Sequence, residues 1–486
     1  MNIWKGVYPH CRLLFASLAT WLAMTAVAYD RTSAQAGLVG DGQTLNTTAL
    51  QQAIDRISAK GGGRITLTPG TYLTGCLQLR SGVELHFEKG AVLLGSSNPD
   101  HYQPLDIDAA GNDQRNDNSR LALIVAHRAR NIRLTGEGTI DGNGLALALA
   151  IDSLHHAGVR PDPHYNQRRM RPSETARPKL LFLSDCEHIS MTGLHLRNSA
   201  CWGLSFDQCR HMQLRNLDIL NRAYWNNDGI DLTDCRDVAI RQCCINSADD
   251  GICLKSYHVD GECSDISISK CNIATSASAV KFGTASWGAF RHVNIDSIRV
   301  RDTFRSAIAI ESVDGATIDN ISVSHIHATN TGNPIFIRLG HRAGQKPGSI
   351  SNVTISDISV EVPFGRPDIN YDLRGPEPDF FHNPLPSVIS GIPGHPIRNL
   401  TIRNAQLVYP GRASKSMAYV PLSRVKDIPE NIDHYPEFTM FGELPAWGFF
   451  IRHVEGLHLE NIDMRTLEPD YREPYVFYDV SNVSTE

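Results

Sequence analysis

The sequence predicts an all-β protein, a right-handed parallel β-helix with a short capping helix at its N-terminal end. Small residues recur every 22 to 28 residues through the middle of the chain, at Gly203, Gly229, Gly251, Ala279, Ala307 and Pro334. An alternating apolar pair follows each of them, such as Ile230/Leu232, and the repeats carry a second alternating run, such as "VNIDSIRV". This period-two pattern indicates short strands between turns, and such repeats bury their inner faces by stacking into a solenoid. A β-propeller, the alternative, needs blades of about 40 residues, longer than these repeats.

The first coil of a solenoid needs a cover, and the stretch "NTTALQQAIDRISAKGGG" supplies one. Its apolar residues follow helical spacing, Asn46 or Thr47 is the expected N-cap, and glycines end the helix. We expect this helix to close the N-terminal end of the core.

The N-terminal residues have the features of a secretory signal peptide. Lys5 and Arg12 flank the apolar run "LLFASLATWLAMTAVA", and small residues suited to cleavage follow, at Ala28 or Ala36. A retained membrane anchor is the alternative. Because no later stretch is long and apolar enough to span a bilayer, we expect residues 1–36 to be removed. Residues 37–486 then form a single secreted or periplasmic domain, a monomer with no membrane contact.

The composition argues against nucleic acid as a partner and indicates the state of the cysteines. The net charge of −6 provides no basic field for nucleic acid. The chain has 11 cysteines, and four of them recur in similar contexts, at Cys186, Cys209, Cys235 and Cys263. Such a repeated position favours free, buried thiols over a disulfide scaffold, with one or two bridges between adjacent turns as the alternative.

Three segments interrupt the repeat, near residues 144–179, 364–394 and 435–448. The first contains "HYNQRRMRPSETARPK", the second is rich in proline and aromatic residues, and the third contains "YPEFTMFGELPAWGFF". Long insertions on one face of a solenoid commonly build a binding site. We expect these loops to wall a cleft.

Aligning the repeats places Asp228 and Asp250 at matching positions of adjacent coils, with Asp249 beside them. Neighbouring strands lie about 4.8 Å apart, so three carboxylates this close cannot all ionise and one pKa should be raised. Glycosidic cleavage needs such a pairing of a protonated acid with an ionised base or nucleophile. The alternative is that these aspartates only cap turns. A calcium site is disfavoured, since the alternating oxygen ligands of a calcium loop are missing.

Four stretches resemble glycoside hydrolase family 28, the polygalacturonase family: "WNNDGID", "SADDGICLKS", "GEGTIDGNG" and "FLSDCEHISMTGLHLRNSACWGL". The run "GGGRITLTPGTYLTGCLQLRSGVELHFEKGAVLLGSS" resembles the opening coils of exo-acting bacterial members, and the resemblance extends from about Gly40 to the final coil. It implies inverting hydrolysis without metal or cofactor, with Asp249 as general acid and Asp228 and Asp250 activating water. It also implies that Asn226 shapes the turn. Carboxylates one strand apart would by themselves favour retention, so inversion depends on the resemblance.

The next two coils depart from the family pattern. Ala277-Ser278-Ala279 replaces Gly-His-Gly, and Ala309-Ile310-Glu311 replaces Arg-Ile-Lys, whose cations grip a galacturonate carboxylate in the family. A typical endo-polygalacturonase is therefore not expected.

Other side chains are expected to take over substrate binding. The candidates are Asn226, Lys255, Ser278, Lys281, Glu311 and Arg338, with Glu311 holding Arg338 or binding a sugar hydroxyl. The alternative for Glu311 and Arg338 is a surface ion pair worth under about 1 kcal/mol. The alternative for Lys255 is that it only neutralises the charge of the aspartate cluster. Arg168, Arg169 and Arg171 either meet an anionic glycan or belong to a solvated loop.

The sequence thus predicts a glycoside hydrolase that acts on a pectic or related polysaccharide or oligosaccharide, exo-acting and galacturonidase-like. One alternative is a relative acting on another glycan, such as rhamnogalacturonan or a neutral side chain. Another is a non-catalytic carbohydrate-binding β-helix. A β-helix lyase would need calcium or a basic catalytic side chain and would yield unsaturated products.

Overall fold

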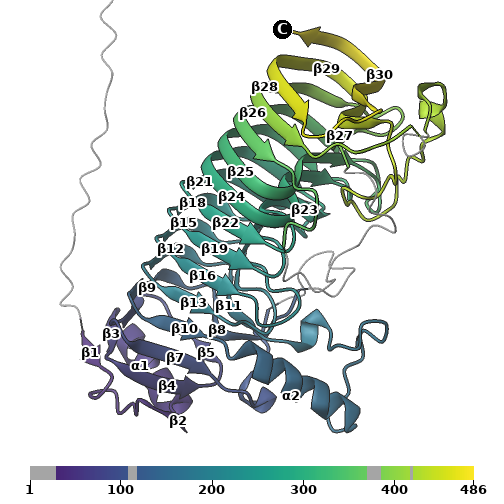
Figure 1. Ribbon diagram of the computed structural model, residues 1–486. Helices are drawn as coiled ribbons and strands as arrows, with labels where there is room; N and C mark the ends of the chain where they lie inside the picture. The colour runs from purple at the N-terminus through teal and green to yellow at the C-terminus, as the bar shows by residue number, and fades with distance from the viewer. Residues whose placement is uncertain (1–28, 108–117, 369–384, 416–419) are drawn as a thin grey trace, which may run out of the picture.

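The computed structural model describes residues 29–107, 118–368, 385–415 and 420–486. The chain winds into a right-handed parallel β-helix, which confirms the predicted fold class (Figure 1). Each coil contributes short strands to three ladders in which every pairing is parallel, and each ladder forms one face of the helix.

The first ladder carries the site described below. It comprises β5 (Leu77–Gln78), β8 (Ala122–His127), β11 (Lys179–Ser184), β14 (Leu204–Asp207), β17 (Ile230–Thr233), β20 (Ile252–Ser256) and β23 (Val280–Ser286).

The second ladder comprises β1 (Arg31–Thr32), β3 (Gly63–Leu67), β6 (Val83–Phe87), β9 (Arg130–Gly136), β12 (Glu187–Thr192), β15 (Arg210–Arg215), β18 (Arg236–Arg241) and β21 (Glu262–Ser269). The third comprises β2 (Asp41–Leu45), β4 (Gly70–Thr74), β7 (Ala91–Gly95), β10 (Thr139–Asp141), β13 (His195–Arg197), β16 (Asp218–Asn221), β19 (Cys244–Ser247) and β22 (Asn272–Thr275).

In the C-terminal half, long strands run around the corners of the coil and join more than one ladder. These are β24 (Ala289–Ser312), β25 (Thr317–Leu339), β26 (Ser349–Glu361), β28 (Ile397–Tyr409), β29 (Ala446–Thr466) and β30 (Glu473–Thr485), with the short β27 (Ser387–Ser390) between them.

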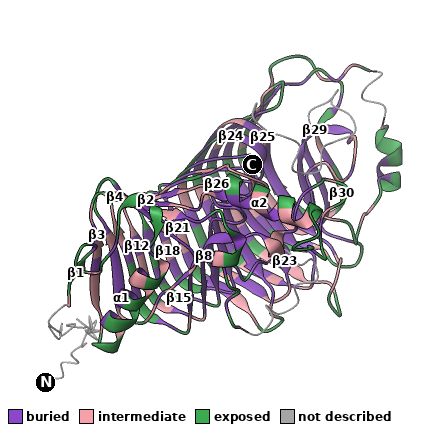
Figure 2. Cartoon of the chain, turned by 90° about the horizontal axis from the view of Figure 1, so that it is seen from below, coloured by how far each residue is buried: buried purple, intermediate pink, exposed green. Residues whose placement is uncertain are grey.

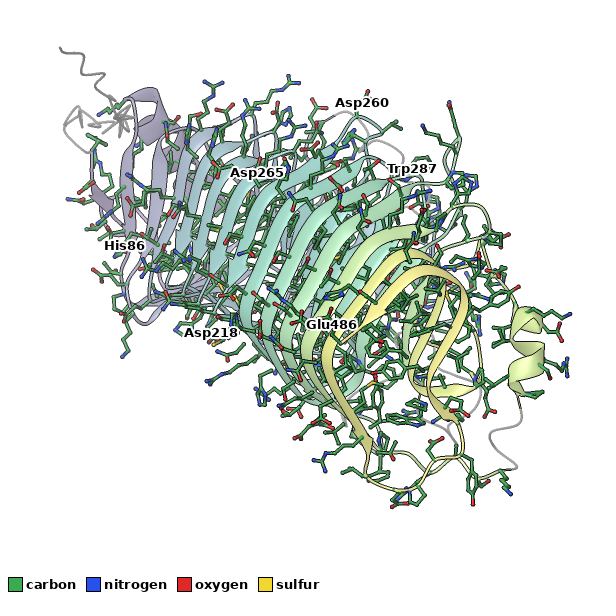
Figure 3. The ribbon with its side chains drawn as sticks, turned by 90° about the horizontal axis from the view of Figure 1, so that it is seen from above. His86, Asp218, Asp260, Asp265, Trp287 and Glu486 are labelled. Carbon is green, nitrogen blue, oxygen red and sulfur yellow. The ribbon has the colours of Figure 1, made fainter. Side chains whose placement is uncertain are left out.

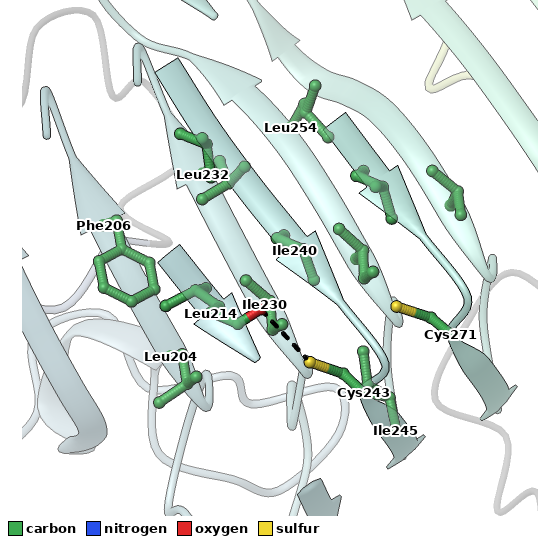
Figure 4. Close-up of a cluster of buried hydrophobic side chains, with 14 of the residues drawn as sticks. Leu204, Phe206, Leu214, Ile230, Leu232, Ile240, Cys243, Ile245, Leu254 and Cys271 are labelled. Atoms are coloured by element: carbon green, nitrogen blue, oxygen red, sulfur yellow. Dashed lines mark hydrogen bonds between the residues drawn. The ribbon is translucent and has the colours of Figure 1, made fainter. Parts of the chain in front are cut away.

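The core is a set of stacked aliphatic side chains. One inward row runs through consecutive coils in register and is fully buried: Leu204, Ile230, Ile252, Val280, Ile308 and Ile335. Figure 2 shows the buried strand interiors, and Figure 4 shows Leu204 and Ile230 within this stack. All ten cysteines of the described chain are free and eight are buried, Cys243 and Cys271 among them (Figure 4). The prediction of unpaired thiols is confirmed for this part of the chain.

The turns explain why polar residues recur at fixed places on the outside. Several strands of the second ladder have a residue in the left-handed conformation near their N-terminal end, as at His188 (φ 55°), His211 (φ 58°), Asp237 (φ 52°) and Asp265 (φ 54°). Asn, Asp and His tolerate this conformation better than other non-glycine residues. Figure 3 places Asp265 on the outer surface, so these residues serve the turn.

The predicted capping helix is present as α1 (Thr47–Ala59), with Asn46 at the N-cap position. It buries Leu50, Ile54 and Ile57 over the first coils. The Asn46 side chain does not cap the helix itself. Its Oδ1 accepts a hydrogen bond from the Val39 backbone N–H (2.7 Å), which ties the helix to the preceding strand region.

Residues 1–28 of the predicted signal peptide, which spans residues 1–36, lie outside the described residues. Arg31 and Thr32 already pair with β3. A cut after Ala28 would keep this strand in the mature chain, whereas a cut after Ala36 would remove it. The α-helices of the described chain, α1 and α2 (Gly144–His156), each have 13 residues and are too short to cross a bilayer.

The three predicted loops are more structured than expected. Residues 144–156 form α2, which buries Leu147, Ala148 and Ile151, and irregular chain with the short η2 (Glu174–Ala176) follows. The second segment includes β27, while residues 369–384 lie outside the description. The third is irregular up to the start of β29 and follows η3 (Leu422–Asp427). A further short 3-10 helix is η1 (Pro99–His101). In Figure 1, α2 and the chain before β29 project from the same side of the helix.

Candidate active site

The paired aspartates occupy equivalent places on successive coils, as predicted. Strands β17 and β20 pair with Ile230 opposite Ile252, so Asp228 and Asp250, each two residues earlier, stack one coil apart. The backbone confirms this stacking, because the Gly229 N–H donates to the Asp250 carbonyl (2.9 Å). A neighbouring row on the same strands is likewise in register and comprises Ser205, Asp231, Cys253, Lys281, Ala309 and Phe336.

Close approach of the coils explains the glycine that follows each of these aspartates. A Cβ on Gly229 would lie 2.4 Å from the Gly251 carbonyl oxygen, and one on Gly251 would lie 2.6 Å from the Ala279 carbonyl oxygen. Real Cβ atoms are not found that close to backbone. The Asp-Gly repeat therefore combines a packing requirement with an outward carboxylate.

The turn before Asp228 is held rigidly. Asn226 adopts the left-handed conformation (φ 57°), and its Oδ1 accepts a hydrogen bond from Arg177 Nη2 (2.7 Å). Asn227 is fully buried, and its Nδ2 donates to the carbonyls of Ser199 (2.9 Å) and Cys201 (2.7 Å). Asn226 therefore shapes the turn, as the resemblance implied.

The aspartates face a cavity of about 460 Å³ built from three parts of the chain. The coils, the segment after α2 and the segment before β29 all contribute lining residues. They are Asn166, Arg168, Arg169, Arg171, Glu174, Trp202, Asn226, Asp228, Asp249, Asp250, Lys255, Tyr257, Lys281, Thr284, Ala285, Arg305 and Tyr435.

Two buried lysines compensate the acids. Lys281 Nζ lies 3.1 Å from Asp250 Oδ2. Lys255 Nζ lies 3.0 Å from Asp231 Oδ1 and 3.5 Å from Asp228 Oδ2. All five residues are at most 6% exposed. At such burial an unpaired charge would be strongly destabilising, so each lysine stabilises the ionised form of its neighbour.

These surroundings separate the acidities of the two adjacent aspartates. Burial and the charge of Asp250 raise the pKa of Asp249. Burial also acts to raise the pKa of Asp250, but Lys281, Lys255 and Arg305 outweigh it and hold that pKa below its ordinary value. Burial and the neighbouring Asp231 raise the pKa of Asp228 well above its usual range. Asp249 is thus the weaker acid and the adjacent Asp250 the stronger one, a separation of acidities that acid–base chemistry requires.

The predicted binding residues divide into two groups. Asn226, Lys255 and Lys281 line the cavity, as do Arg168, Arg169 and Arg171 of the segment after α2. Ser278, Glu311 and Arg338 do not line it. The Ser278 backbone N–H donates to Asp250 Oδ1 (3.1 Å) and so positions that carboxylate. Glu311 is buried, and burial raises its pKa to about 7 although Lys281 opposes this.

The structure contradicts a substrate contact for Arg338. Its guanidinium is 1% exposed and donates to Ser390 Oγ (2.8 Å) and to the carbonyls of Gly391, Glu430 and Asn431. Glu311 and Arg338 are register partners on β24 and β25. Their side chains nevertheless form no ion pair in the described structure, because residues 430 and 431 cover Arg338 and take its donors.

Arg305 was not predicted as a site residue, although a signal for it existed. It lines the cavity, and its Nε lies 2.9 Å from Glu437 Oε2. In the aligned repeats, Asp250, Ser278 and Ser306 occupy equivalent positions on successive coils. The residues directly before them are Asp249, Ala277 and Arg305, which therefore also occupy equivalent positions. Extending the alignment by one residue would have found it. Tyr435 and Glu437 carry no such signal, because they reach the site from a distant loop.

A second acidic group lies outside the cavity lining. Single ligand atoms of Asp207, Asp234 and His258 all lie within 4.8 Å of one another. Asp234 accepts hydrogen bonds from the backbone N–H groups of Tyr257 and His258, both 3.1 Å. Burial raises the pKa of Asp207 to about 6, and His258 opposes this. Since these residues come from three successive coils, the group ties the coils together beside Lys255.

Comparison with known proteins agrees with this geometry. The family model for "Glycosyl hydrolases family 28" matches residues 78–365, more than half of the chain. A probable polygalacturonase of Vitis vinifera is 30% identical over 264 residues, 53% of this chain and 50% of that protein. An exo-poly-alpha-D-galacturonosidase of Dickeya chrysanthemi is 39% identical over 125 residues, 25% and 20% of the two chains. The matched part of the chain spans at most about half the length of these two relatives.

Solved structures show the same fold. The family 28 exopolygalacturonase of Yersinia enterocolitica superposes with a TM-score of 0.65 at 18% identity, covering 94% of this chain and 78% of that one. The exopolygalacturonase of Thermotoga maritima gives 0.60 at 18% identity, covering 78% and 87%. The family model, which matches more than half of the chain, establishes that the chain belongs to glycoside hydrolase family 28.

Proposed function

We propose that the protein hydrolyses glycosidic bonds of a pectic, galacturonate-containing polysaccharide or oligosaccharide, releasing sugar from the chain end. One observation carries the proposal: Asp249, with a raised pKa, stands beside Asp250, with a lowered pKa, in a cavity ringed by cations. The names of the relatives from Vitis vinifera and Dickeya chrysanthemi support this substrate class.

In the proposed reaction Asp249 donates its proton to the glycosidic oxygen as the bond to the anomeric carbon breaks. Asp250, kept ionised by Lys281, accepts a proton from the water that attacks the anomeric carbon from the opposite face. Asp228 orients that water. The products are a free leaving-group hydroxyl and a sugar of inverted configuration, and solvent restores both carboxyl groups.

The loops favour action at chain ends. The segment after α2 contributes Arg169 and Arg171 to the cavity, and the segment before β29 contributes Tyr435. Because the two segments wall the cavity from both directions along the helix axis, the cavity accommodates the end of a glycan better than a continuous chain that would have to pass through it. The same proposal includes a monomeric enzyme that is secreted or periplasmic after removal of a signal peptide within residues 1–36.

The test compares the native protein with the Asp249→Asn variant on linear oligogalacturonides, rhamnogalacturonan fragments and neutral pectic side chains. Mass spectrometry identifies the products, and ultraviolet absorbance detects unsaturated ones. We expect saturated monosaccharide from oligogalacturonides and a loss of rate of about 10²- to 10⁴-fold in the variant.

Asp237→Asn is the matched control, since it makes the same change at an exposed turn of a neighbouring coil, and its rate should equal that of the native protein. Saturated products from rhamnogalacturonan or neutral side chains alone would replace the proposed substrate. Unsaturated products would indicate a lyase, and the absence of any product would favour a binding protein.

A further inference from the structure

Arg171 is a buried cation on the wall of the cavity. It lies in the segment between α2 and β11, where a two-residue antiparallel bridge joins it to Asn166. Only 6% of the residue is exposed, and its guanidinium lies 4.3 Å from the centre of the Trp225 ring. The bridge and the aromatic face hold the guanidinium at one place beside the cavity.

The hydrogen-bonding capacity of Arg171 is not used up. Its Nη2 donates to Glu174 Oε1 over a long 3.4 Å, and its Nη1 is buried without a hydrogen-bond partner. Buried guanidinium nitrogens without an acceptor are costly. An acceptor that enters the cavity would remove this cost.

The local charge balance also favours an anion. Arg171 and Arg177 share the single carboxylate of Glu174, whose Oε1 lies 3.4 Å and 3.7 Å from their Nη2 atoms. The charges of Arg169 and Asp249 also act on Arg171, so three cations face two carboxyl groups and at least one positive charge is in excess. Burial and the charge of Arg177 lower the pKa of Arg171, although its guanidinium stays protonated at neutral pH.

The other buried cations of the cavity wall already have carboxylate partners. Lys281 pairs with Asp250, Lys255 pairs with Asp231, and Arg305 pairs with Glu437. Arg177 directs its nitrogens to Asn226 Oδ1 and to the carbonyls of Ala200 and Trp225. Among these groups Arg171 retains the spare capacity for a negatively charged ligand.

We propose that Arg171 binds the carboxylate of a uronic acid unit of the substrate and so determines selectivity for acidic over neutral or esterified sugars. This inference deepens the proposed function and depends on it. The planar guanidinium suits a carboxylate, which it binds through two parallel hydrogen bonds. A loop residue thereby takes over the recognition that Ala309 and Glu311 cannot provide from the strands.

The test measures kcat/KM for an oligogalacturonide and for the same oligosaccharide with its carboxylates methyl-esterified. Arg171→Gln should lower kcat/KM on the acid about 10- to 100-fold, the range of a charged hydrogen bond, and leave the ester within about threefold. Arg171→Lys, which keeps the charge but not the planar fork, should lie between. Arg160→Gln is the control, since it removes an exposed arginine of the same segment that does not line the cavity.

Two results would overturn the proposal. Equal losses on the acid and the ester would show that Arg171 only supports the fold, and an unchanged rate on the acid would show that it binds no carboxylate. If the native protein cleaves no galacturonide, the proposed function fails separately. Calorimetry of oligogalacturonide binding to Asp249→Asn, with and without Arg171→Gln, then decides: binding that requires Arg171 supports the inference, and binding that is absent or independent of Arg171 rejects it.

Discussion

The helix carries buried cations along one face in two regions, and it uses them differently. Near β20 and β23, Lys255 and Lys281 pair with carboxylates at a cavity. Near β25 and β29, Arg338 and Arg452 donate to the backbone of residues 428–431 and share Ser390 Oγ. The first pair serves a site, whereas the second fastens a loop.

The difference shows what decides the use of a charge in a β-helix. Register places a side chain on a face, but the segment that lies over the face decides what the side chain meets. Residues 428–431 bury both arginines. The same segment continues to Tyr435, which lines the cavity, and to Glu437, which pairs with the cavity residue Arg305. The arginines thereby hold up one wall of the site without touching the cavity.

The largest expected effect tests the cation at the site. Lys281→Met should lower kcat/KM about 10²- to 10³-fold at the native optimum, a typical cost for losing a preorganised charge. A nearby cation stabilises ionised carboxylates, so removing Lys281 should raise the pKa values of Asp250 and Asp249. Both limbs of the pH–rate profile should therefore move to higher pH.

The measurement is kcat/KM against pH on the best oligosaccharide. Lys346→Met, at an exposed position, should leave the profile in place. An unmoved acid limb in Lys281→Met would show that Asp250 does not depend on this lysine.

The next effect tests the cation under the loop. Arg338→Met leaves the carbonyls of Gly391, Glu430 and Asn431 without their donor, which should lower the free energy of unfolding by about 3 kcal/mol. Activity should fall by about tenfold, because Tyr435 loses its support. Urea denaturation measures the first effect, and limited proteolysis between residues 420 and 445 reports release of the loop.

Arg398→Met is the control for this comparison, since Arg398 on β28 is exposed and pairs with Glu455. Its change should stay within about 0.5 kcal/mol. If Arg338→Met unfolds at the native urea midpoint and resists the protease equally well, the fastening role is wrong.

The smallest expected effect concerns the close backbone contact between the coil of Gly251 and the next coil along the helix. Gly251→Ala places a Cβ against the Ala279 carbonyl and should cost about 1–3 kcal/mol, with a shift of Asp250. Ala279→Gly, the reverse change one coil on, should cost about 1 kcal/mol and leave activity within about threefold. Thermal unfolding and kcat measure both, and equal activity losses would remove the distinction.

Much of the fold and part of the site follow from the sequence for a physical reason. Alternation with a period of two decides which side chains face inward, so the aligned repeats place Asp228 above Asp250 and Ser205 above Asp231 without further information. The burial of Arg338 was not predictable in this way. The residues that cover Arg338 lie about 90 positions later in the sequence, and no local sequence pattern predicts such a contact. The helix α2 was missed because its apolar residues were grouped with the polar, proline-containing chain that follows.

The two-coil placement of the acids has a consequence for how the molecule can evolve. A solenoid tolerates the gain or loss of whole coils, since each coil contacts only its neighbours. Here Asp228 and Asp250 lie on adjacent coils, while Tyr435 is delivered by a loop anchored further along the axis. Deleting one coil between them would move that tyrosine about 4.8 Å along the axis, further than a hydrogen bond can stretch. The proposed active site therefore fixes the number of coils in this part of the β-helix, a number that folding alone would leave free to vary.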